Sequence, residues 1–106
     1  MDHALCKLTL VFSPSGADRI IDLLLTTEPP LQGFTSWTGE GHGHSFGAAT
    51  ISERVRGRVQ KSGIFAVLEP SRATDLLEEI RIKSPVIPIT FWIEPVTRFG
   101  HLTTDQ

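Results

Sequence analysis

The sequence has no tyrosine, one cysteine and no long run of apolar residues. A single cysteine excludes an intrachain disulfide and fits a reducing compartment. No apolar run approaches the roughly 20 residues of a transmembrane helix, and the first residues lack the basic start and the cleavage site of a signal peptide. We therefore expect a soluble, cytoplasmic protein in which Cys6 is a small buried residue on the first strand.

The chain also lacks an excess of either charge, since 10 basic residues stand against 12 acidic ones. That balance gives no general attraction to nucleic acids or to anionic membranes. No Ser-His-Asp arrangement in a catalytic context, no carboxylate pair in an apolar setting and no P-loop is present. We expect a protein that is not an enzyme, does not bind nucleic acid and does not insert into a membrane.

What the sequence does contain is one globular domain of 106 residues, 40% of them hydrophobic, built from two similar halves. Phe12-Ser-Pro-Ser and Leu68-Glu-Pro-Ser precede two helical patterns at an offset of 56 residues. Alternating and helical apolar spacings define the other elements. The expected elements are strands at 5–12, 33–38, 59–68 and 86–93, helices between Ser13 and Glu28 and between Glu69 and Ser84, and a short final strand at about 97–102.

Two βαβ halves in tandem predict a ferredoxin-like α+β sandwich with a four-stranded antiparallel sheet. Both helices would cover one face, and an irregular excursion at about 39–57 would join the second and third strands. Phe91 and Trp92 must point to opposite faces of the last strand, so the uncovered face would expose a large aromatic side chain. Covering it is worth roughly 2 to 3 kcal/mol, which favours a homo-oligomer. Trp37 is expected to pack in the core or between subunits.

Candidate ligand residues are concentrated in the segment 39–47, GEGHGHSFG. Glu40, His42 and His44 alternate, so an extended backbone projects them from one side. Carboxylate and imidazole groups suit zinc, copper, nickel or cobalt, and His101 or His3 could complete a metal site from the same or a neighbouring subunit. The alternative is that these are solvated polar residues in a mobile, glycine-rich linker.

A second hypothesis is an anion or nucleotide cleft. Glycines let a phosphate approach the backbone closely, and arginines at alternate positions share one side of an extended segment. The residues that would form this cleft are Gly39, Gly41, Arg54, Arg56, Arg58, Lys61 and Arg98. The alternative is a solvated basic edge that prevents strands from aggregating.

Three segments carry a resemblance to a known family: CKLTLVFSP at 6–14, GFTSWTGEGHGHSFG at 33–47 and TFWIEPV at 90–96. With the order of elements, they resemble the PII signalling superfamily, and in particular the small PII-like proteins often encoded beside heavy-metal efflux pumps. The resemblance implies a homotrimer of ferredoxin-like subunits. Its excursion, called the T-loop, would respond to a small ligand between subunits and then contact a protein partner.

The resemblance thus implies a non-enzymatic regulator that binds a divalent transition metal at the T-loop and acts on a heavy-metal efflux system. The alternative is a nucleotide-sensing adaptor of a membrane transporter, including bicarbonate transporters. The sequence departs from nucleotide-binding PII proteins, whose segment T-G-x-x-G-D-G-K precedes the last strand. Here residues 82–89 read IKSPVIPI, and the tyrosine modified in some relatives is missing. Nucleotide binding of the usual kind is therefore unsupported.

Overall fold

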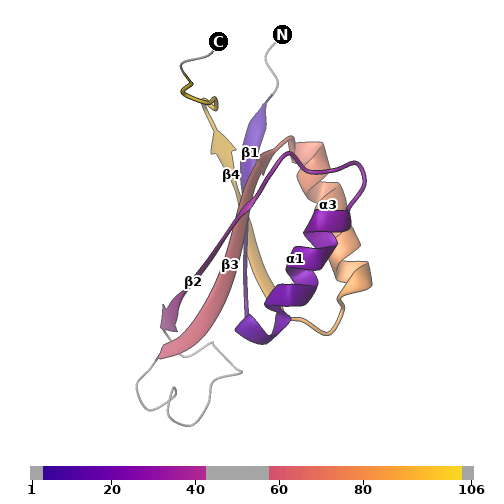
Figure 1. Cartoon of the computed structure of the whole chain (residues 1–106), viewed down its shortest axis with the longest axis vertical. Coiled ribbons are helices and arrows are strands. Elements are labelled where there is room, and N and C mark those ends of the chain that lie inside the picture. Colours follow the sequence, from indigo (N-terminus) through magenta and orange to yellow (C-terminus); the bar gives the residue numbers. More distant parts are fainter. Residues whose placement is uncertain (1–3, 43–57, 104–106) are drawn as a thin grey trace.

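A computed structural model describes residues 4–42 and 58–103, with only the backbone described at Arg58. Four strands form one antiparallel sheet in the order β2-β3-β1-β4, and two helices lie against one face of it (Figure 1). This is the predicted ferredoxin-like α+β arrangement. The elements are β1 (Leu5–Phe12), η1 (Pro14–Gly16), α1 (Ala17–Thr26), β2 (Thr35–His42), β3 (Arg58–Leu68), α3 (Pro70–Lys83) and β4 (Ile89–Val96).

Both helical segments begin at a proline, as the repeated Pro-Ser pairs predict. Pro14 opens the single turn η1, which leads directly into α1, and Pro70 is the first residue of α3. A proline is tolerated there because the first helical N–H groups have no partner within the helix. Ser13 precedes η1 but makes no capping hydrogen bond with its side chain, so the proline marks this start.

The hydrophobic core lies between the sheet and the two helices. The central strand β1 pairs with β3 on one side and β4 on the other, and its even-numbered residues face the helices. Burial raises the pKa of the Cys6 thiol, which fits its predicted place in the core. The buried side chains of this cluster are Cys6, Leu8, Leu10, Phe12, Ile20, Leu23, Leu24, Ile64, Ala66, Leu68, Ala73, Leu76 and Ile80.

Several predicted strand boundaries differ from the structure. β2 begins at Thr35 instead of residue 33, and β3 begins at Arg58 instead of residue 59. β2 continues to His42, past the predicted end at residue 38, because it pairs with β3 up to the partner of His42, which is Arg58. The predicted excursion at 39–57 therefore begins in a strand, and residues 43–57 lie outside the described residues. β4 covers Ile89–Val96 instead of 86–93. The final strand predicted at 97–102 is wrong, because residues 97–103 form no strand.

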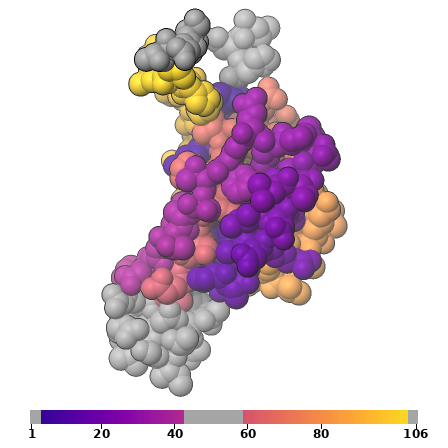
Figure 2. Space-filling view, in the orientation of Figure 1, coloured from indigo at the N-terminus to yellow at the C-terminus, as the bar shows by residue number. Residues whose placement is uncertain are grey.

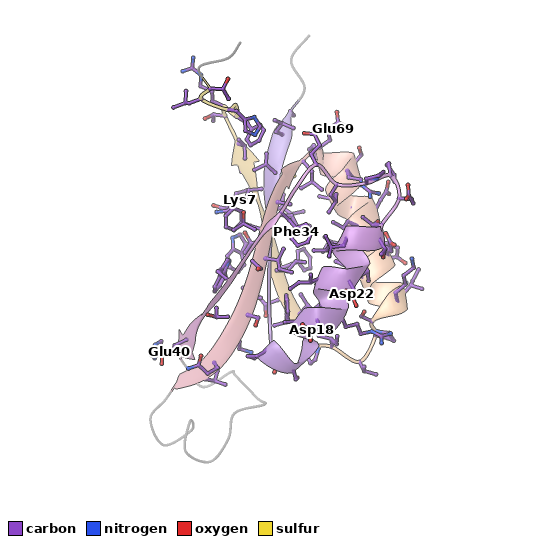
Figure 3. The ribbon with its side chains drawn as sticks, viewed as in Figure 1. Lys7, Asp18, Asp22, Phe34, Glu40 and Glu69 are labelled. Atoms are coloured by element: carbon purple, nitrogen blue, oxygen red, sulfur yellow. The ribbon has the colours of Figure 1, made fainter. Side chains whose placement is uncertain are left out.

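No described element covers the sheet face opposite the helices, which we call the open face (Figure 1). Lys7 lies on this side in Figure 3, with its Nζ 4.6 Å from the centre of the Phe65 ring. Trp92 is 44% exposed and donates a hydrogen bond from Nε1 to Glu94 Oε1 at 3.1 Å. Phe91 lines a groove against α3, so the predicted opposite orientation of Phe91 and Trp92 is confirmed. No helix among the described residues is long and apolar enough to cross a membrane.

Candidate functional site

The candidate site lies on the two-stranded ribbon formed by the end of β2 and the start of β3. Figure 2 shows β2 along one side of the molecule, beside α1. Glu40 and His42 are exposed and sit at alternate positions of β2, opposite Gln60 and Arg58 of β3. Figure 3 shows Glu40 at the end of the ribbon, away from both helices. The strand therefore holds Glu40 and His42 on one side, about 6.7 Å apart along its axis.

His101 lies elsewhere in the chain. Its ring meets the Phe99 ring edge-on, with centroids 5.4 Å apart. Both residues line a hollow of about 340 Å³ together with Thr35, at the start of β2. From Thr35 to His42 the strand runs about 23 Å, so one chain does not bring His101 to Glu40 and His42.

The remaining predicted ligands, His44 and His3, lie outside the described residues. Within the described ranges, no three histidine, cysteine, aspartate or glutamate side chains form a cluster that could hold a metal ion. Of the predicted metal ligands that the structure describes, it places Glu40 and His42 near each other and His101 apart from them.

The residues of the predicted anion cleft are also divided. Gly39 pairs with Lys61 and Gly41 with Val59 across the ribbon. Arg98 follows β4, in the segment near the C-terminal end of the chain that lies away from the ribbon (Figure 1). The Arg58 backbone lies opposite His42, whereas Arg54 and Arg56 are outside the described residues. The structure therefore joins Gly39, Gly41 and Lys61 but not Arg98.

A contact at the base of the ribbon was missed by the sequence analysis. The ring of Trp37 in β2 covers Gly63 of β3, and a Cβ atom at Gly63 would lie 2.1 Å from two ring carbons. A Cβ at Gly39 would lie 3.2 Å from the same ring. Trp37 is 37% exposed and outside the core, so packing in the core is wrong, and packing between subunits stays a prediction. The signal was the cross-strand pair of a large residue with glycine, which is visible only once the register is known.

A second hollow, of about 590 Å³, separates α3 from the edge strand β4. Its floor is apolar, and its rim carries Glu78 and Arg81, which form an exposed ion pair. The hydrogen bond from Arg81 lowers the pKa of Glu78, and the same bond raises the pKa of Arg81. A paired carboxylate of lowered pKa is not poised for proton transfer near neutral pH.

The sequence matches, over residues 2–103, a family described as "Protein of unknown function (DUF3240)". The chain belongs to the DUF3240 family. A DUF3240 family protein from Shewanella baltica OS155 has a similar crystal structure, with a TM-score of 0.76 at 20% identity, covering 97% of this chain and 100% of that one. No protein with curated annotation matches the sequence.

The DUF3240 chain also resembles PII proteins in structure. CPII, a nitrogen regulatory PII-like protein from Thiomonas intermedia K12 bound to ADP, AMP and bicarbonate, has a TM-score of 0.67 at 16% identity, covering 94% of this chain and 98% of that one. Arabidopsis thaliana PII bound to citrate has a TM-score of 0.64 at 15% identity, with coverages of 90% and 79%. At these identities the similarity shows the fold. The predicted resemblance to PII proteins is confirmed at that level.

Proposed function

We propose that this protein is a cytoplasmic, non-enzymatic PII-like regulator that binds a divalent transition metal on the β2–β3 ribbon and acts on a protein partner. The observation that carries the proposal is the placement of Glu40 and His42 on one side of β2, at the exposed end of the ribbon. Zinc takes carboxylate and imidazole ligands at about 2.0 to 2.2 Å, so two such side chains at alternate strand positions can reach one ion. His44 continues the same alternation.

The metal site needs further ligands, and self-association can supply them. His101 would come from a neighbouring copy, since one chain keeps it at the other end of β2. The open face supports a homotrimer because it leaves Trp37 and Trp92 exposed by 37% and 44%. Burying aromatic side chains in a subunit interface is favourable. The partner we propose is a component of a heavy-metal efflux system, on the basis of the family resemblance.

Titration calorimetry of tag-free protein with zinc, copper, nickel and cobalt tests the metal site. We expect saturable heat with at least one metal, and its loss in His42→Ala and in His44→Ala. His101→Ala should weaken binding only in protein that sedimentation shows to be oligomeric. Unchanged heat in both His42→Ala and His44→Ala would contradict the site, and a monomer at micromolar concentration would contradict the trimer.

A nucleotide-sensing adaptor of a membrane transporter, such as a bicarbonate transporter, is the second candidate. It is favoured by the pairing of Lys61 with Gly39 on the ribbon and by the PII-like fold shared with CPII, whose structure holds ADP, AMP and bicarbonate. Gly41, Arg54, Arg56 and Arg58 would complete the anion cleft. Arg98 would have to come from a neighbouring copy, because one chain keeps it away from the ribbon. A thermal-shift screen with adenine nucleotides and bicarbonate tests it. We expect a rise in Tm that Lys61→Ala reduces, and no shift with any of these compounds would dispose of this candidate.

A further inference from the structure

We propose that Trp37 is a positioning residue: it holds the ribbon that carries Glu40 and His42, and it couples a ligand bound there to the open face of the sheet. The coupling rests on the proposed metal site. The positioning role rests on the contacts of the Trp37 ring alone.

The contact of Trp37 with Gly63 joins the two strands of the ribbon. The ring lies so close to the β3 backbone that a Cβ at Gly63 would be 2.1 Å from it, and it extends along β2 to within 3.2 Å of a Cβ at Gly39. Glycine at position 63 is therefore required by the close approach of an indole ring. Such an aromatic–glycine pair across two strands fixes their register and twist.

Trp37 is also the last residue of β2 with a side chain on the open face. Alternate residues of β2 share this face with Phe65 through the β3 register, and after Trp37 these positions are Gly39 and Gly41. Glycine has no side chain to pack against a neighbouring strand and weakens a strand interior. After Trp37, no described residue of β2 has a side chain on the open face, although the strand continues to Glu40 and His42. On β2, the ring is therefore the last described side chain of this face that can set the direction of the ribbon, although β3 still carries the buried Val59 opposite Gly41.

The same ring belongs to the surface on which we place the subunit interface. Trp37 shares the open face with Phe65 of the neighbouring strand β3 and, two strands beyond β3, with Trp92 of β4. A second copy on this face would cover the exposed part of the Trp37 ring. A ligand that changes the twist of the ribbon would therefore move the Trp37 ring. Conversely, a second copy that packs against the ring would favour one twist of the ribbon. Coupling of this kind acts equally in both directions.

The first experiment needs no ligand. Gly63→Ala should push the ring off β3, whereas Gly33→Ala is a matched control because a Cβ there meets nothing within 4 Å. In metal-free protein we expect faster amide hydrogen exchange at Glu40 and His42 in Gly63→Ala, but unchanged exchange at Leu8 and Leu10 in β1. Trp37→Ala should reproduce the effect, and Gly63→Ala should add little to it. Equal ribbon exchange in Trp37→Ala, in the control and in the unmodified protein would overturn the positioning role.

The second experiment adds zinc alone. Trp92→Phe leaves Trp37 as the only tryptophan of the two in the sequence, so emission reports on its ring. We expect zinc to change this emission, and Gly63→Ala to weaken zinc binding by about tenfold, with no change in Gly33→Ala. Zinc heat without an emission change, and with equal affinity in both glycine variants, would overturn the coupling alone. Absence of zinc heat in the unmodified protein would overturn the coupling together with the proposed metal site.

Discussion

Leu8 and Thr9 are adjacent in β1 and are buried alike, with 2% and 3% of their surface exposed, but they face different sides of the sheet. Leu8 packs in the core under the helices. Thr9 lies on the open face, where its strand neighbours are Phe65 and Trp92. Its Oγ1 is buried and has no hydrogen-bond partner among the described residues.

This difference indicates that the two faces of the sheet have different roles. Apolar burial against α1 and α3 stabilises the single chain. The open side retains exposed aromatic rings and a buried hydroxyl without a partner in the described ranges. Neither feature stabilises an isolated chain, but both suit a surface that another molecule covers.

The largest effect should come from the helix side. Leu8→Ala removes a side chain from the core and should lower the free energy of unfolding by about 3 kcal/mol, measured by urea denaturation. The control is Leu25→Ala on α1, where the leucine is 67% exposed and the expected change is within about 0.5 kcal/mol. Equal losses in the two variants would break the comparison, because they would mean that the helix side holds no tightly packed core.

The next largest effect should come from the hydrogen bonds between α3 and the turn after α1. Arg72 of α3 donates from Nη2 to the Pro29 carbonyl at 2.6 Å and to Thr27 Oγ1 at 3.1 Å, so it anchors the turn after α1. Arg72→Ala should cost about 1 to 2 kcal/mol of unfolding free energy, because these bonds involve a charged donor. Arg81→Ala is the control, since its partner Glu78 is exposed. A loss in Arg72→Ala no greater than in Arg81→Ala would contradict this anchoring.

Replacing two buried threonines, one on each side of the comparison, should change the free energy of unfolding in opposite directions. Thr9→Val should raise the free energy of unfolding by about 1 kcal/mol, because valine has a similar shape and no unpaired hydroxyl. Thr27→Val should lower it, because Thr27 Oγ1 donates to Glu79 Oε1 at 2.6 Å and accepts from Arg72. Urea denaturation of both variants tests the pair. A loss of stability in Thr9→Val would show that its hydroxyl is hydrogen-bonded in solution.

The smallest effect on the free energy of unfolding should appear at acidic pH. The hydrogen bond from Lys83, followed by that from Thr27, lowers the pKa of Glu79 below its reference value of 4.5. A lowered pKa stabilises the folded state above about pH 4.5, and this contribution is lost as the pH falls through the lowered value. Unfolding free energies between neutral pH and about pH 3 should therefore fall less steeply in Glu79→Gln and in Lys83→Ala. Unaltered acid dependence in both would contradict the role of Glu79.

The sequence predicted most of the fold from local patterns. The strand at 5–12 is confirmed to the residue, because its apolar alternation is uninterrupted. Prolines marked both helix starts, and the repeat of the two halves predicted the ferredoxin-like, four-stranded antiparallel sheet. The ends of β2 and β4 were less accurate. Glycines 39 and 41 erase the alternation of β2, and an edge strand such as β4 ends where its partner β1 stops pairing.

The candidate site was predicted in part. The alternation of Glu40 and His42 indicated that they share one side, and β2 holds them in that way. The distance of His101 from this pair was not accessible, because the segment after β4 has no periodicity that places it. The contact of Trp37 with Gly63 was missed for a related reason: it depends on which residue of β3 lies opposite Trp37.

The sequence by itself determined the type and order of the elements and which residues face the core, because periodicity and proline positions act over a few neighbouring residues. Only the tertiary structure decided how far β2 continues, where His101 lies and what the Trp37 ring covers. These features depend on strand register, which is set by contacts between distant parts of the chain. The local sequence thus determines which chemical groups the ribbon carries at Glu40 and His42, and the tertiary structure determines where the ribbon lies.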